Sequence, residues 1–202
     1  MISANQCFPI FDACIQQYHV IDAVDQALLN PHEKDTFEAL LFHKCWVDTV
    51  QWHFEDLIRD PEIDPFAGME LKRKIDHSNQ IRTNMVEQID DWFLSLFKDI
   101  KEQPDAQLNT ESPAWVIDRL SILALKIYHM QEQANRVDIS EDHKLKSQAR
   151  LTILLEQKHD LMLSFDQLIT DIASGKRKMK VYRQMKLYND PNTNPVLYGK
   201  KA

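Results

Sequence analysis

Residues 113–131, PAWVIDRLSILALKIYHMQ, constrain the fold most because the stretch is apolar almost all round. At 100° per residue, one helical face carries four aliphatic side chains: Val116, Leu120, Leu123 and Ile127. Ile122 and Leu125 lie nearly opposite that face, and a helix that is apolar on most sides is buried. Ser112 and Pro113 are typical of the N-cap and first turn. We therefore expect a central helix surrounded by others.

The same stretch also carries polar and charged side chains: Asp118, Arg119, Ser121, Lys126 and His129. Charged groups stay in a core only when they are paired, hydrogen-bonded or bound to a ligand. Asp118 and His129 project in one direction, whereas Arg119 and Lys126 project from a neighbouring stripe. Lys126 fits either phosphate binding or a side chain that extends to the rim. Polar partners are therefore expected on neighbouring helices.

The rest of the chain also favours helices, because only three of its 202 residues are glycine. Asn30-Pro31 is typical of a helix start, and Pro61 and Gly175 are typical of helix ends. We predict helices over residues 8–28, 31–60, 66–101, 113–136 and 140–175. Short connections between long helices favour antiparallel neighbours. The expected fold is one all-α domain over residues 1–202, an up-down bundle of four long helices plus an N-terminal helix.

An irregular basic tail, residues 175–202, is expected to pack on this bundle. The net charge is −7, yet residues 176–202 hold eight Lys or Arg and one Asp, so the body before them is strongly acidic. An acidic body argues against general nucleic-acid binding. The tail fits either a lid over a site or an arm that contacts a partner.

Cysteine use and hydropathy favour a cytoplasmic protein. Cys7, Cys14 and Cys45 form an odd set without metal-type spacing, which suits a reducing compartment. The N-terminus lacks a basic region followed by an apolar run, and no apolar run approaches a membrane span. We expect no membrane association, and a homo-oligomer is compatible with these features.

The predicted helix 31–60 carries a polar line on one flank: Thr49, His53, Asp56 and Asp60. Imidazole and carboxylate at this spacing can share a metal ion, or the carboxylate can orient His53 as a general base. A solvated edge with a His–Asp hydrogen bond fits the same spacing.

The predicted helix 66–101 carries a longer polar line: Lys72, Asp76, Asn79, Thr83, Glu87 and Asp90, with Gln80 and Asn84 on the next stripe. Arg82 falls within the adjoining apolar face, where its permanent charge must meet a carboxylate, carbonyl groups or a bound anion. An internal ion pair with Asp118 or with an acid on the preceding helix is the alternative to a ligand.

The chain resembles a bacterial family known as domain of unknown function 4254. The resemblance rests on four segments: WVDTVQWHFEDLIRDP, KRKIDHSNQIRTNMVEQID, NTESPAWVIDRLSILALKIYHM and YRQMKLYNDPNTNPVLY. It covers nearly the whole chain and implies an all-helical intracellular protein without implying an activity. A shorter likeness concerns the all-helical nucleoside triphosphate pyrophosphohydrolases, whose second magnesium motif, Glu-x-x-Asp, matches Glu87–Asp90. Their preceding Glu-x-x-Glu has no counterpart at a suitable distance.

These observations favour an interior or cleft site for a small phosphorylated or otherwise anionic ligand, with metal-assisted phosphate hydrolysis or transfer as the reaction class. The expected catalytic residues are His53, Asp56, Asp118 and His129. The expected ligand-binding residues are Asn79, Gln80, Arg82, Thr83, Arg119 and Lys126. The expected ligands of a divalent metal such as Mg²⁺ are Asp56, Asp76, Glu87 and Asp90. The alternative is a non-enzymatic interaction protein whose buried polar groups pair only with one another.

Overall fold

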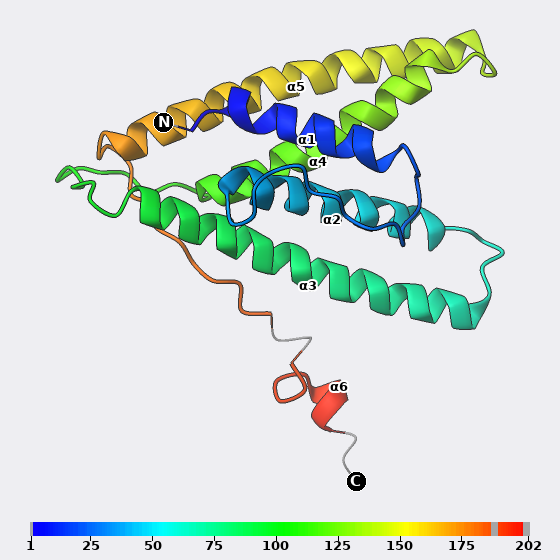
Figure 1. The fold of residues 1–202 in the computed structure, drawn as a ribbon, viewed down its shortest axis with the longest axis horizontal. Coiled ribbons are helices and arrows are strands. Elements are labelled where there is room, and N and C mark those ends of the chain that lie inside the picture. The colour runs from blue at the N-terminus through cyan, green and yellow to red at the C-terminus, as the bar shows by residue number, and fades with distance from the viewer. Residues whose placement is uncertain (1, 187–189, 200–202) are drawn as a thin grey trace.

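The computed structural model describes residues 2–186 and 190–199, and this part of the chain folds as a helical bundle (Figure 1). Four long helices form the bundle: α2 (Phe37–Leu57), α3 (Pro65–Leu96), α4 (Pro113–Asn135) and α5 (Glu141–Ala173). They are accompanied by α1 (Ala4–Tyr18) and by the four-residue α6 (Pro195–Tyr198). The predicted all-α bundle is therefore confirmed. Within the described residues, no helix combines the length and the hydropathy that crossing a membrane requires.

Helix α4 is the centre of the bundle because it contacts α1, α2, α3 and α5. Ile117, Leu120 and Leu125 of α4 are fully buried, as expected for a helix that is apolar on most sides. The four long helices form two hairpin-like pairs, α2 with α3 and α4 with α5. Helix α1 packs against α2, α4 and α5 and inserts Phe11 and Tyr18 into the shared core.

Local sequence signals explain where the long helices begin. The side chains of Thr36, Asp64 and Ser140 accept hydrogen bonds from backbone N–H groups in the first turns of α2, α3 and α5. Pro65 and Pro113 occupy the first positions of α3 and α4, where a missing N–H costs nothing. These starts match the expected boundaries closely, except for α2.

The region between α1 and α2 differs from the prediction of a helix over residues 8–28 and a second helix from residue 31. Helix α1 ends at Tyr18, and Asp22 and Asp35 adopt the left-handed backbone region, with φ of 56° and 66°. Asn30 accepts a hydrogen bond from the N–H of His32 at 3.1 Å, so the Asn-Pro pair forms a turn and does not cap α2. Residues 19–36 therefore form an irregular connection.

Gly175 reverses the chain after α5. Its φ is +73°, and its N–H donates to the carbonyl of Ile172 at 2.9 Å. The carbonyl of Gly175 accepts from the N–H of Gln103 at 2.8 Å, and Gln107 pairs with the chain at 176–178. The connection between α3 and α4 is thereby attached to the end of α5.

The chain after Gly175 runs along α3, and α6 lies beyond it, apart from the other helices (Figure 1). Arg183 pairs with Asp91, and the N–H of Gln184 donates to Glu87 at 2.9 Å. Further along, Lys186 donates to Thr83. The expected tail also includes residues 187–189 and 200–202, which lie outside the described residues.

Glycine substitutions at two positions should change stability in opposite directions. A Cβ at Gly175 would lie 2.4 Å from the carbonyl oxygen of Lys101 and would occupy a left-handed conformation, so Gly175→Ala should destabilise the protein by more than about 1 kcal/mol. Gly68 in α3 has ordinary space, with Ile63 at 3.7 Å, so Gly68→Ala should stabilise by about 0.5–1 kcal/mol. Urea denaturation measures both, and equal effects would contradict this account.

Candidate functional site

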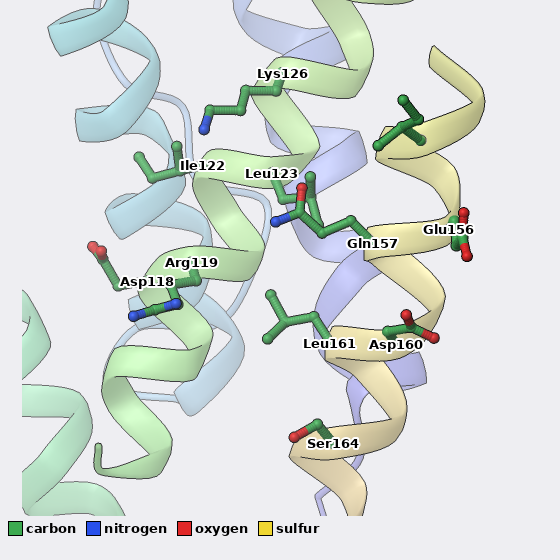
Figure 2. A pocket seen from close by; sticks show the side chains of 11 residues that line it. Asp118, Arg119, Ile122, Leu123, Lys126, Glu156, Gln157, Asp160, Leu161 and Ser164 are labelled. Atoms are coloured by element: carbon green, nitrogen blue, oxygen red, sulfur yellow. The ribbon is translucent and has the colours of Figure 1, made fainter. Parts of the chain in front are cut away.

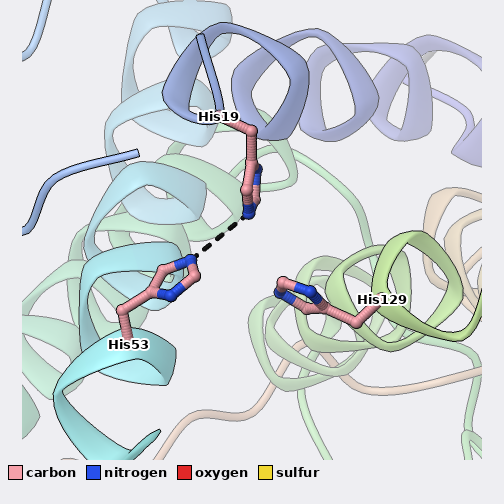
Figure 3. Close-up of side chains that lie close together, drawn as sticks. All are labelled: His19, His53 and His129. Carbon is pink, nitrogen blue, oxygen red and sulfur yellow. Dashed lines mark hydrogen bonds between the residues drawn. The ribbon is translucent and has the colours of Figure 1, made fainter. Parts of the chain in front are cut away.

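Three histidines, two from helices and one that directly follows α1, converge near the end of α1 (Figure 3). His19 follows the last residue of α1, His53 lies on α2, and His129 lies on α4. The Nε2 atoms of His19 and His53 are 3.3 Å apart. One ring nitrogen from each of the three histidines lies within 4.8 Å of the others. We call this group the histidine triad.

Hydrogen bonds on the outer side of two rings determine which nitrogen faces the centre. His19 Nδ1 lies 2.7 Å from the carbonyl oxygen of Ile15, and a carbonyl only accepts, so Nδ1 carries the hydrogen. His129 Nδ1 lies 3.0 Å from a carboxylate oxygen of Glu132 in the same way. In a neutral imidazole, both arrangements leave the lone pair on Nε2, as in histidines that bind metals. His129 Nε2 is buried and has no hydrogen-bond partner in the described part of the chain.

Aromatic side chains hold the three rings in place. Tyr18 stacks on His53 with centroids 5.1 Å apart, and Trp52 stacks on His129 at 5.0 Å. Tyr128 stacks on His19 at 4.3 Å. These contacts restrict ring rotation, so the nitrogen atoms stay directed at a common point.

Besides Glu132, a second carboxylate stands next to the triad. An oxygen of Asp22 lies 3.7 Å from His53 Nε2 and 3.9 Å from His19 Nε2. The left-handed backbone at Asp22, with φ of 56°, is sparsely populated for a residue other than glycine. This turn directs the side chain back toward the two imidazoles.

The surroundings of His53 lower its pKa and so favour the neutral imidazole. Burial lowers the pKa of His53 most, and the neighbouring His19 and His129 lower it further, while Asp22 and Asp56 raise it. Burial also disfavours the charged form of Tyr18 and raises its pKa to about 12, so its phenol stays protonated. A neutral imidazole is the form that binds a metal.

The geometry suits a borderline metal ion. Zinc binds histidine nitrogen at about 2.0–2.1 Å, which separates tetrahedral ligand atoms by about 3.3 Å. The distance between His19 Nε2 and His53 Nε2 already has this value, 3.3 Å. Imidazole suits Zn²⁺, Cu²⁺ and Ni²⁺, whereas Mg²⁺ prefers oxygen. Three nitrogen ligands would leave a fourth position for water or for Asp22.

A second polar cluster, the buried charge network, joins α2, α3 and α4. Asp48 is 1% exposed and accepts hydrogen bonds from Arg82 Nε at 2.6 Å, from Ser121 Oγ at 2.5 Å and from Lys44. Lys44, fully buried, also lies 2.5 Å from Asp118, whose same oxygen is 3.6 Å from Arg82 Nη2. Two cations and two carboxylates therefore compensate one another.

The network keeps Arg82 charged in a mostly buried position. Burial is the largest influence and lowers the pKa of Arg82, but attraction to Asp48 and Asp118 together outweighs it and raises the pKa overall. On the solvent side, Arg82 Nη1 donates to the side-chain oxygen of Asn79 at 3.3 Å. The network is therefore closed by groups of this chain.

A groove of about 880 Å³ runs between α4 and α5. Its α4 wall includes Asp118, Arg119 and Lys126. Figure 2 shows Gln157 and Leu161 directed from α5 toward α4, whereas Glu156 and Asp160 point away from it. Lys126 is exposed in this groove.

The expected site residues separate into several places. The structure brings His53 together with His129 in the triad, and Arg82 together with Asp118 in the network. Arg119 pairs with Glu111 and shares the groove with Lys126. Three other expected residues lie on α3: Asn79 and Thr83 both contact Lys186, and Gln80 donates to Asn84 at 2.9 Å.

The four acids expected to bind Mg²⁺ do not form one group. Three are held by a nearby cation: Asp56 by Arg59 at 3.6 Å, Asp76 by Lys72, and Glu87 by Arg183 at 3.9 Å. Asp90 is 1% exposed, and burial raises its pKa. Asp56 stands on α2 and the other three lie on α3, so the helical line along α3 does not collect oxygen ligands at a point.

Three residues of these clusters were not identified from the sequence. The helix predicted over residues 8–28 includes His19, although His19 follows the end of α1 in the structure. Lys44 and Asp48 have the i, i+4 spacing of an ordinary surface pair. The sequence does carry one indication that Lys44 is buried, because it lies within the mostly apolar run LLFHKCWV.

Comparison with known proteins gives one family. Residues 38–181 match the family described as Protein of unknown function (DUF4254), so the chain belongs to that family. Neither the curated proteins nor the solved structures contain a match. The family description assigns no activity, and any function must be argued from the geometry.

Removing the charge of Asp48 should destabilise the fold strongly. Asp48→Asn would leave Lys44 and Arg82 with Asp118 as their one carboxylate, and an uncompensated buried charge costs about 3–5 kcal/mol. Asp91→Asn is the matched control, because Asp91 is 56% exposed and pairs with Arg183 at the surface, where screening makes the loss small. Equal losses in urea denaturation would contradict a closed network.

Proposed function

We propose that this member of the DUF4254 family binds a divalent transition metal of the zinc class through His19, His53 and His129. The observation that carries the proposal is the convergence of three imidazoles around His129 Nε2, a buried nitrogen with no partner among the described residues. A buried polar atom without a hydrogen bond costs about 1–3 kcal/mol, and a metal ion would supply the missing interaction.

The coordination points to hydrolysis as the reaction class. A zinc ion with three histidine ligands lowers the pKa of a bound water to about 7, which supplies hydroxide near neutrality. If a metal were bound, Asp22, with an oxygen 3.7 Å from His53 Nε2, would be near enough to accept a proton from that water or to serve as a further ligand. We propose a small anionic ligand, with a phosphoester as the first class to test, because Arg119 and Lys126 line the groove on the same helix as His129.

A non-enzymatic role is the second candidate, and the buried charge network favours it. Asp48, Arg82 and Asp118 are satisfied within the chain, so they need no ligand. In this account the metal would attach α1 to α2 and α4 and would have no reaction to perform. Chromogenic phosphomonoesters and phosphodiesters offered to zinc-loaded protein separate the two: hydrolysis lost in His53→Gln supports the enzyme, and metal binding without hydrolysis of either ester supports the structural role.

Metal binding should depend on each histidine of the triad. Titration calorimetry and elemental analysis should show one Zn²⁺ bound in preference to Mg²⁺, and His19→Gln, His53→Gln and His129→Gln should each weaken binding at least tenfold. Glu132→Gln should cost about 10–100-fold, because Glu132 orients His129. His159→Gln, exposed on α5, is the control and should bind normally. Absence of binding, or equal binding by the triad variants, would refute the proposal.

Stability of the metal-free protein should fall as the pH is lowered below about 6.5. The pKa of His53 is lowered in the folded state, so the unfolded chain binds this proton more readily and stability is lost from the unfolded pKa downward. The slope for one proton is at most about 1.4 kcal/mol per pH unit. Urea denaturation in chelator at pH 7.5, 6.5 and 5.5 should show a smaller loss for His53→Gln, and an equal loss would contradict the assignment.

A further inference from the structure

A second cavity, of about 350 Å³, opens where α2, α4 and α5 meet. Its lining is mostly apolar and includes Trp52, Met130, Ile153 and Leu154. Such a volume lies within the range of about 300–1,000 Å³ typical of small-molecule sites. The outer face of the triad borders it, because His129 lines the cavity and stacks on Trp52.

Two cationic side chains stand in the lining of this apolar cavity. Lys126 comes from α4 and Arg150 from α5, and both are exposed. Over residues 2–186 and 190–199, neither side chain has an ion-pair or hydrogen-bond partner in the chain, unlike Arg119, which pairs with Glu111. The cavity therefore combines an apolar wall with two uncompensated positive charges.

Ile153 shows that the apolar wall continues to the surface. It is 64% exposed, and it lines both this cavity and the larger groove between α4 and α5, as does Lys126. An exposed aliphatic side chain of this size gains free energy when a ligand removes it from water, at about 25 cal/mol per Å². The positive charges of Lys126 and Arg150 favour a ligand with a negative charge.

We propose that this cavity binds a soluble amphiphile with one aliphatic chain and an anionic head, a phosphate or a carboxylate. The aliphatic chain would lie against Trp52, Ile153 and Leu154, and the head would lie between Lys126 and Arg150. This site goes beyond the proposed metal centre and does not require it, because His129 Nε2 is buried and His129 Nδ1 faces Glu132, so the ligand would not need either nitrogen.

Titration calorimetry of the metal-free full-length protein tests the proposal, with octyl phosphate below its micelle concentration as the probe. Octyl phosphate should bind at least tenfold more tightly than butyl phosphate, inorganic phosphate or octanol, since each buried methylene contributes up to about 0.8 kcal/mol. Octanoate should also bind, because the proposal requires an anionic head and not phosphate in particular. Equal binding of octyl and butyl phosphate, or of octyl phosphate and octanol, would overturn it.

Variants separate the two recognition elements. Lys126→Gln and Arg150→Gln should each weaken octyl phosphate at least threefold and leave octanol unchanged, whereas Ile153→Asn should weaken both. Leu163→Asn and Lys144→Gln, on α5 but outside the lining, should leave every affinity unchanged. Circular dichroism and the melting temperature check that each variant folds.

Two other occupants of the cavity are excluded by the same design. Binding to vesicles of anionic lipid but not to monomeric octyl phosphate would indicate a membrane surface and overturn the proposal. A doubling of mass in sedimentation that Ile153→Asn abolishes would indicate a second copy of the chain and also overturn it. Failure of Zn²⁺ binding together with normal octyl phosphate binding would reject the metal centre alone.

Discussion

Asp48 holds the interior of this bundle together, because one buried carboxylate accepts hydrogen bonds from residues of its own helix, of α3 and of α4. Burying a carboxylate is expensive unless its charge is compensated, and here Lys44 and Arg82 compensate it while Asp118 balances the second positive charge. Each of these four charged side chains needs an oppositely charged partner, and this requirement restricts how α2, α3 and α4 are placed around one another. Such a network favours one relative placement of the helices over alternatives that would leave a charge unpaired.

The histidine triad depends on this placement. His53 and His129 stand on α2 and α4, two of the helices that the charge network joins, so their separation is set by the same core. His19 has a different support, because it follows a short helix whose Phe11 and Tyr18 pack into the bundle. The irregular residues 19–36 then carry Asp22 back toward the imidazoles. A rigid core and a flanking turn thus contribute different parts of the same polar cluster.

The sequence predicts which helix is buried and which buried charge needs a partner, but it does not predict which side chains of different helices meet. The apolar circumference of α4 predicts its central place. The position of Arg82 within an apolar face predicts a carboxylate, carbonyl groups or a bound anion as its partner, and the structure supplies the carboxylates of Asp48 and Asp118. Periodicity describes one helix at a time, so it could not show that His19 meets His53 and His129 across three helices. Helical periodicity also puts Asp76, Glu87 and Asp90 on one stripe of α3. That stripe extends over several turns, so the three carboxylates together are too far apart to bind one ion.

The extent of the family match has a consequence for the triad. The matched segment, residues 38–181, contains His53 and His129 but excludes His19 and the whole of α1. A fragment trimmed to that segment would keep two of the three imidazoles, lose Asp22, and uncover the core surface on which Phe11 and Tyr18 rest. The three-histidine cluster therefore depends on residues that precede the matched segment, which by itself supplies two of the three imidazoles.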